Sequence, residues 1–152
     1  AHMRGVASPL DYEEALNIML TSNHFASKVF LQNNITSITD VTGFGLARHT
    51  LNLTKPFGAK INIKDTPKIN GATKYLNNGI YSSLSKSNKE EINFNKIIKN
   101  ENSIIFDPQT SGGLLAAVDR KKSKKVISEL KENNCYAAII GEVIEKEEFE
   151  LN

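Results

Sequence analysis

The chain has 152 residues, of which 39% are hydrophobic and 24% charged, and its net charge is +2. This length and composition are typical of one folded domain, and the nearly balanced charge does not favour binding to nucleic acid or to an anionic membrane surface. No apolar run is long enough to span a membrane, and the single Cys135 cannot form an internal disulfide. We therefore expect a cytoplasmic protein.

The first three residues, "AHM", resemble the remnant of a cleaved expression tag, so we expect residues 1–3 to lie outside the fold. Residues 4–152 are then predicted to form a single domain. Because "RGVASPL" follows without an initiator context, this domain is expected to be a fragment of a longer protein.

The first third of the chain predicts two helices, a short strand and a third helix. Residues 11–23 carry apolar side chains at helical spacing, with Asp11 as the expected N-cap and Glu14 three residues on. A second helix over residues 24–34 ends at two asparagines, and the β-branched "ITSITDV" favours a strand. The helical pattern of "FGLARHTLNL" follows. The stretch "TDVTGFG", residues 39–45, is thus predicted to be a strand-to-helix turn.

The rest of the chain predicts a mixture of strands and helices. "AKINIKD" alternates as a strand stopped by Pro67, "INGATKYLNNG" is a short helix, and residues 82–102 are expected to be loop with some irregular helix. "SIIF", "LLAAV" and "CYAAIIGEVIE" are predicted strands, with a lysine-rich helix at about residues 120–133 between the last two. Parallel pairing of those two through a right-handed crossover is expected. The predicted class is α+β, or mixed α/β, with a mixed sheet packed against helices.

Two turns carry unusual residues. In "DPQTSGG", residues 107–113, Asp107 can accept hydrogen bonds from backbone amides ahead of it and the glycine pair permits close approach, so the pattern alone indicates a tight structural turn.

In the first turn, Gly43 and Gly45 can shape the bend, Thr42 can cap the next helix and Phe44 can enter the core. Asp40 is not explained in this way. It ends a strand where α/β proteins tend to present ligand-binding groups, and its carboxylate suits Mg²⁺.

Together, "DVTGFGLARH" and "DPQTSGGLLAAV" resemble the two signature stretches of the C-terminal domain of selenophosphate synthetases, also called selenide, water dikinases, within the aminoimidazole ribonucleotide synthetase-like superfamily. The resemblance extends over residues 10–143. It implies an enzyme that forms selenophosphate, AMP and phosphate from selenide, ATP and water with Mg²⁺.

The resemblance also implies how the work is divided within the longer protein. The catalytic residues, most of the ATP site and the dimer contact belong to an N-terminal domain, so no catalytic residue is expected in this chain. Asp40 corresponds to the Mg²⁺ ligand that the C-terminal domain contributes across the domain cleft. Thr42 and Gly43 are the expected nucleotide contacts.

One departure is Arg48, which stands where the family has glycine in "GLxGH" and either faces solvent or adds a cation near the phosphates. Two alternatives to a selenophosphate synthetase are another ATP-dependent enzyme of the superfamily and a non-catalytic partner-binding domain. "GFG" after the threonine and the complete "DPQTSGG" favour the selenium branch.

Other reactive side chains receive structural interpretations. His24 and His49 have no neighbouring ligands at metal-binding spacing, and Cys135, within an apolar segment, is interpreted as a core residue. The basic run over residues 120–125 is interpreted as a solvated helix face.

Overall fold

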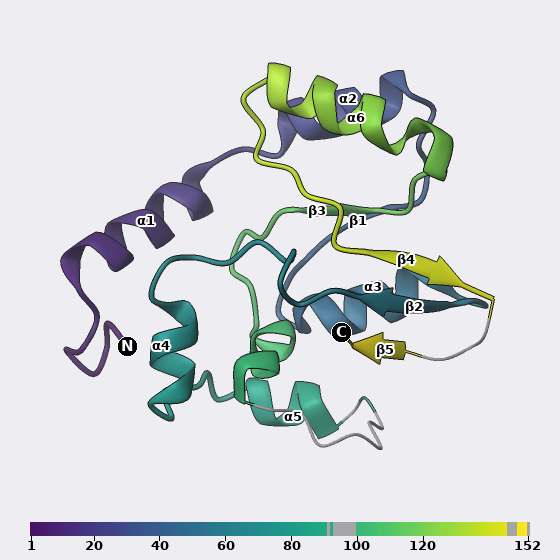
Figure 1. Ribbon diagram of the computed structural model, residues 1–152. Helices are drawn as coiled ribbons and strands as arrows, with labels where there is room; N and C mark the ends of the chain where they lie inside the picture. The colour runs from purple at the N-terminus through teal and green to yellow at the C-terminus, as the bar shows by residue number, and fades with distance from the viewer. Residues whose placement is uncertain (91, 93–99, 146–148, 152) are drawn as a thin grey trace. The chain divides into compact units, whose positions relative to one another are not determined.

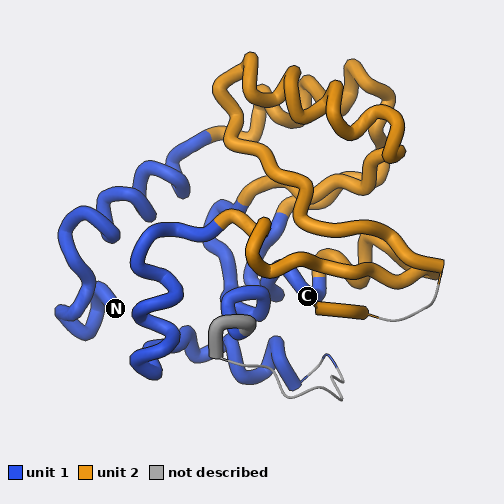
Figure 2. Tube along the Cα trace, viewed as in Figure 1, with its two compact units in different colours: residues 1–21, 41–48, 68–112 blue, residues 22–40, 49–67, 113–152 orange. Residues whose placement is uncertain are grey.

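The computed structural model describes residues 1–90, 92, 100–145 and 149–151. These residues form two compact units, each built from three separate stretches of the chain (Figure 2). Unit 1 comprises residues 1–21, 41–48 and 68–112, and unit 2 comprises residues 22–40, 49–67 and 113–152. Helices and strands are both present, which confirms the predicted α+β class (Figure 1). That residues 4–152 form a single domain stays a prediction.

Unit 1 is largely helical. It contains α1 (Pro9–Leu20), α4 (Ala72–Asn77), α5 (Ser85–Glu90) and the 3-10 helix η1 (Asn100–Phe106), together with the first turn of α3 (Gly45–Thr54). Both α4 and α5 pack against η1, whose Ile105 and Phe106 are almost completely buried. Hydrophobic burial around η1 therefore holds the short helices of this unit together.

Unit 2 contains two small sheets. In the first, β1 (Ile38–Asp40) pairs with β3 (Leu114–Ala116) in antiparallel register, with Asp40 opposite Leu114. In the second, the central β2 (Gly58–Ile61) pairs antiparallel with β4 (Gly141–Ile144) and parallel with β5 (Phe149–Leu151).

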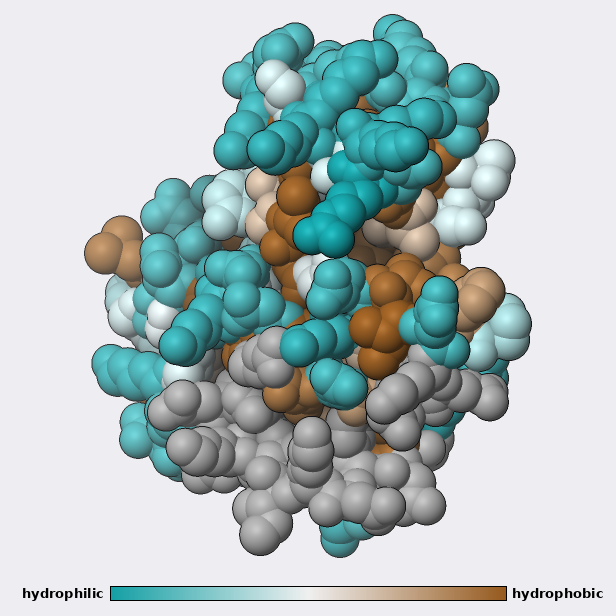
Figure 3. Space-filling view, turned by 45° about the vertical axis from the view of Figure 1, so that its right-hand side comes forward, coloured by the Kyte–Doolittle hydropathy of each residue, from teal (hydrophilic) through white to brown (hydrophobic). Residues whose placement is uncertain are grey.

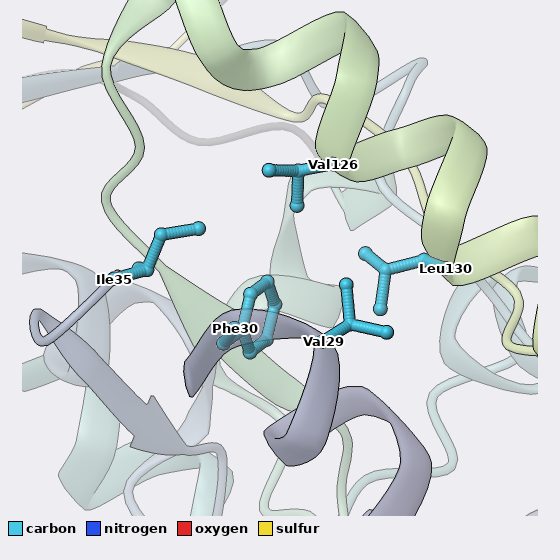
Figure 4. Packing of buried hydrophobic residues seen from close by; sticks show 5 residues of the cluster. All are labelled: Val29, Phe30, Ile35, Val126 and Leu130. Carbon is cyan, nitrogen blue, oxygen red and sulfur yellow. The ribbon is translucent and has the colours of Figure 1, made fainter. Parts of the chain in front are cut away.

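Two helices of unit 2, α2 (His24–Gln32) and α6 (Arg120–Glu132), pack against each other. Their facing side chains form a hydrophobic cluster with the chain that leaves α2, shown in Figure 4. The cluster consists of Val29, Phe30, Ile35, Val126 and Leu130. At the polar edge of this contact the buried Asn33 accepts a hydrogen bond from Lys125 and donates one to Glu129. The amphipathic pattern of each helix is thus satisfied by the other.

Several predicted elements are confirmed, with shifted ends. The N-cap of α1 is Ser8, which accepts a hydrogen bond from the Asp11 amide, so the prediction of Asp11 as N-cap is wrong. Pro9 at the first helical position explains the earlier start, since proline fits there without losing a hydrogen bond. The strand β2 ends at Ile61 rather than continuing toward Pro67, because the Asn62 side chain accepts the Lys64 amide and turns the chain.

The predicted crossover is wrong. The strands on either side of α6 lie in different sheets, because β3 pairs with β1 while β4 pairs with β2. The handedness rule applies only to strands of one sheet. The parallel partner of β2 is β5, which was not predicted.

Two further strand predictions need correction. "SIIF" belongs to η1, because a short buried apolar run fits a helical turn as well as a strand. "CYAAIIGEVIE" is a strand only over its last part, β4. In the expected loop over residues 82–102, α5 is helical, while residues 91 and 93–99 lie outside the described residues.

Among the residues that the structure describes, no helix is both long enough and apolar enough to cross a membrane.

Candidate functional site

The first signature turn connects the end of β1 with the start of α3, as predicted. The Gly45 amide donates a hydrogen bond to the Thr42 carbonyl, at 3.0 Å. Gly45 has a φ of +74°, and a Cβ there would lie 2.9 Å from the Ile105 carbonyl oxygen. This position therefore requires glycine for both its conformation and its space.

Two expectations about this turn are wrong. Gly43 has no positive φ, and a Cβ at this position would meet nothing within 4 Å, so the turn geometry does not require glycine there. Phe44 is 56% exposed and does not enter the core. Residues 43 and 44 of the turn are therefore accessible to solvent, Phe44 more than Gly43.

The second signature turn lies against the first within unit 1. The Gln109 amide donates to the Thr42 carbonyl, at 3.0 Å. A Cβ on Gly112 would lie 2.2 Å from the Val41 carbonyl oxygen, so only glycine allows this approach. Next to it, Ser111 takes a left-handed conformation with a φ of 56°. The two sequence motifs, more than sixty positions apart, thus form one assembly of backbone contacts.

A buried residue outside both motifs joins this assembly. The Asn88 side chain in α5 donates to the Gly43 carbonyl at 2.8 Å and to the Phe106 carbonyl at 3.0 Å. The sequence gives little indication of this role, because Asn88 stands in a polar stretch with the composition of a surface loop.

The carboxyl group of Asp107 accepts a hydrogen bond from the Ser85 hydroxyl, at 3.2 Å. Burial raises the pKa of Asp107 above its usual range, and the hydrogen bond from Ser85 offsets part of this increase. Asp107 thus accepts a hydrogen bond from a side chain of α5. The sequence predicts instead that it accepts hydrogen bonds from the backbone amides that follow it.

Asp40, the predicted metal ligand, is the last residue of β1 and is exposed. It belongs to unit 2, whereas the expected nucleotide contacts Thr42 and Gly43 belong to unit 1 and are half-buried. Among the described residues, no group of three or more histidine, cysteine, aspartate or glutamate side chains could hold a metal ion. A single exposed carboxylate such as that of Asp40 can supply one oxygen ligand to a hard cation such as Mg²⁺.

The remaining candidates are accounted for structurally. Cys135 is half-buried and packs against the cluster between α2 and α6, so it lies at the edge of the core, and it precedes β4 rather than standing in a strand. His24 lies at the start of α2 with its ring edge against Phe25. Arg48 is half-buried in α3.

The basic run of α6 is exposed, as predicted. Lys121, Lys124 and Lys125 are accessible to solvent, and the part of the surface that α6 forms is almost entirely hydrophilic in Figure 3. Lys125 also pairs with Glu129 one turn later, at 3.3 Å. An exposed pair of this kind contributes little to stability.

Residues 5–152 match the family model described as AIR synthase related protein, C-terminal domain. The chain belongs to this family. Among relatives of this domain, the selenide, water dikinase of Carboxydothermus hydrogenoformans is 31% identical over 91% of this chain and 42% of its own length. Enzymes of the same name from Clostridioides difficile and Clostridium botulinum strain Eklund 17B are 34% and 36% identical, over 90% and 88% of this chain and 41% of their own lengths.

The AIR synthase-related fold is also found among solved structures. A chain in the crystal structure of a HypE-HypF complex aligns with 85% of this chain and 37% of its own length, at a TM-score of 0.53 and 18% identity. This similarity shows the fold alone. The domain spans about two-fifths of the length of the dikinases that it matches.

Proposed function

We propose that this chain is the C-terminal domain of a selenide, water dikinase, a phosphotransferase that forms selenophosphate, AMP and phosphate from selenide, ATP and water. The proposal is supported by the dikinase names of relatives that are 31% to 36% identical over nearly the whole chain. Both signature turns are present and lie against each other, as a shared role in one site requires.

The observation that carries the proposal is the position of Asp40. Its carboxylate is exposed at the end of β1, directly before a turn whose backbone is held by contacts on both sides. Within unit 2, the pairing of Asp40 with Leu114 fixes the backbone that carries this carboxylate, which favours a role in binding a metal ion.

In the proposed site Asp40 would supply one oxygen ligand to Mg²⁺, which would offset negative charge on the ATP phosphates. Thr42 and Gly43 lie against the nucleotide. The absence of a Cβ on Gly43, in a position where a side chain would meet no neighbour, leaves room for a ligand to approach the backbone. The other metal ligands and the catalytic residues belong to an N-terminal domain.

The remaining features of the proposed enzyme follow from the same resemblance. It is a cytoplasmic homodimer whose dimer contact lies in the N-terminal domain, and it binds ATP and selenide as its small-molecule substrates. The isolated chain is inactive. Metal binding by Asp40 would then require this domain and the N-terminal domain to approach each other around the nucleotide.

Two other functions are compatible with the fold. Another ATP-dependent enzyme of the superfamily would use the same Asp40 with a substrate other than selenide. A non-catalytic partner-binding domain would use both turns for structure only, and Asp40 would then be dispensable.

The test is selenide-dependent AMP release by the full-length protein. Asp40→Ala should lower the rate by about a hundredfold or more, since a lost metal ligand removes several kcal/mol of charge stabilisation. Glu145→Gln, which neutralises another exposed carboxylate of unit 2, is the matched control and should leave the rate unchanged.

Each alternative function gives a different result. ATP hydrolysis that Asp40→Ala abolishes, but that does not depend on selenide, would indicate another enzyme of the superfamily. A wild-type rate in Asp40→Ala would contradict the metal-ligand assignment.

A further inference from the structure

The amide group of Asn88 bonds two carbonyl groups that are far apart in sequence. Its nitrogen lies 2.8 Å from the Gly43 oxygen and 3.0 Å from the Phe106 oxygen. Asn88 is only 6% exposed, so these bonds are formed away from competing water. An amide nitrogen carries two hydrogens and can donate to both acceptors at once.

The chemistry of this position is restrictive. Both partners are acceptors, so aspartate of the same shape would place a negatively charged oxygen against two carbonyl oxygens. Alanine would leave both carbonyls without these donors in a buried region, which is costly. The site therefore selects for a short side chain with two donor hydrogens.

The carbonyl groups of three consecutive residues, 41 to 43, each have a neighbour elsewhere in unit 1. Gly112 packs against the Val41 oxygen, and the Gln109 amide donates to the Thr42 oxygen. Asn88 completes the series at Gly43. The backbone from residue 41 to residue 43 is thus fixed by the second signature turn and by α5.

Fixing these carbonyls also fixes the orientation of the amides. In a trans peptide the C=O and N–H groups point in opposite directions. The N–H groups of Thr42 and Gly43 are therefore directed opposite to the carbonyls that face the second turn, and the Phe44 N–H opposite to the carbonyl that faces α5. Rotation of the Gly43–Phe44 peptide would change this orientation, and the bond from Asn88 opposes that rotation.

We infer that Asn88 is a positioning residue, which sets the peptide orientation of the Thr42–Gly43 turn for nucleotide binding. This inference rests on the proposed function, in which Thr42 and Gly43 lie against ATP. Asn88 itself does not contact the nucleotide. It acts through the backbone of residues that do.

The first arm of the test is residue-resolved hydrogen–deuterium exchange in the full-length protein. The amides of Gly45 and Gln109 both donate to the Thr42 carbonyl and report on the two turns. Asn88→Ala should increase exchange at both by about tenfold or more, because two buried hydrogen bonds are lost. The Asn62 amide, which donates to Ile140 in unit 2, is the internal reference and should not change.

The second arm is steady-state kinetics with Mg-ATP. Asn88→Ala should raise KM by about tenfold, with a smaller change in kcat, since the turn is misplaced while the reacting groups are intact. Asn88→Asp, which keeps the shape but removes the donors, should have the larger effect. Ser87→Ala, on an exposed neighbouring position of α5, is the control and should match the wild type in both arms.

Several results would overturn the inference. In Asn88→Ala, an equal increase in amide exchange at Gly45, Gln109 and Asn62 would show that the whole protein is destabilised. No increase in exchange would show that the Asn88 hydrogen bonds are dispensable. Local acceleration with an unchanged KM would refute the role in nucleotide binding while leaving the proposed function intact. Failure of the wild type to form AMP with selenide would refute the proposed function, and the exchange measurement would still decide whether Asn88 holds the turn.

Discussion

Gly43 and Gly45 lie two positions apart in one turn, but they face different steric limits. Gly45 combines a left-handed backbone with the Ile105 and Phe106 backbone at 2.9 Å from a Cβ, whereas Gly43 has neither restriction. The sequence predicted both glycines as turn residues because glycine is common in turns for several reasons. The left-handed backbone of Gly45 and its contact with η1, far along the chain, distinguish the two positions.

Alanine substitutions should distinguish the roles of Gly43 and Gly45 experimentally. Gly45→Ala is expected to lower the free energy of unfolding by about 1 to 3 kcal/mol, because a strained conformation and a backbone clash are introduced together. Gly43→Ala should change it by less than about 0.5 kcal/mol. Urea denaturation of the two variants measures this difference, and equal losses would contradict the assigned geometry.

Asp107 gives a second prediction at this scale, which concerns pH. Its pKa is raised in the folded state from 3.8, chiefly by burial. The contribution of the Asp107 carboxyl group to the free energy of unfolding is therefore fully present below the unfolded pKa. This contribution is lost as pH rises through the folded pKa. Asp107→Asn keeps an acceptor oxygen for Ser85 but does not titrate.

The Asn variant should consequently gain stability relative to the wild type as pH rises from about 3.5 to 7. Unfolding curves at several pH values measure this gain. A difference that is constant across this range would show that the carboxyl group has no raised pKa.

The helices α2 and α6 show what local sequence patterns can predict and what they cannot. The sequence predicts α2 from apolar spacing and α6 as a lysine-rich helix, and Asn33 with Asn34 correctly marks the end of α2. Their contact could not be predicted, because periodicity identifies the apolar face of a helix and not its partner. Leu130 illustrates this: its helical position is evident in the sequence, but its burial at 5% exposure depends on the cluster formed with α2.

Leu130→Ala should lower the free energy of unfolding by about 2 to 5 kcal/mol, since it leaves a cavity in a packed cluster. Lys124→Ala, on the exposed face of the same helix, should stay within about 0.5 kcal/mol of the wild type. Chemical denaturation compares the two variants. A small effect of the leucine substitution would mean that α2 and α6 do not share a rigid core.

At the scale of the whole molecule, strand pairing was the least predictable feature. Each strand is three or four residues long, and such short runs carry little information about their partners. The order of strand, α6 and strand favoured a parallel pair, but the structure assigns the two strands to different sheets. The approach of the two signature turns depends on similarly distant contacts, although each turn was predicted separately.

The molecule contributes a carboxylate at Asp40 but no complete metal cluster among its described residues. Its dikinase relatives are more than twice as long as the segment that it matches. The proposed function has Asp40 share a metal site with an N-terminal domain, and the dependence of activity on Mg²⁺ concentration tests this sharing.

Asp40→Asn removes the charge of the proposed ligand while keeping its shape. In the full-length protein it should raise the Mg²⁺ concentration for half-maximal selenide-dependent AMP formation by about tenfold or more, because a neutral amide is a weaker ligand for a hard cation. The Glu145→Gln control should keep the wild-type value. An unchanged Mg²⁺ dependence in Asp40→Asn would show that Asp40 does not bind the metal.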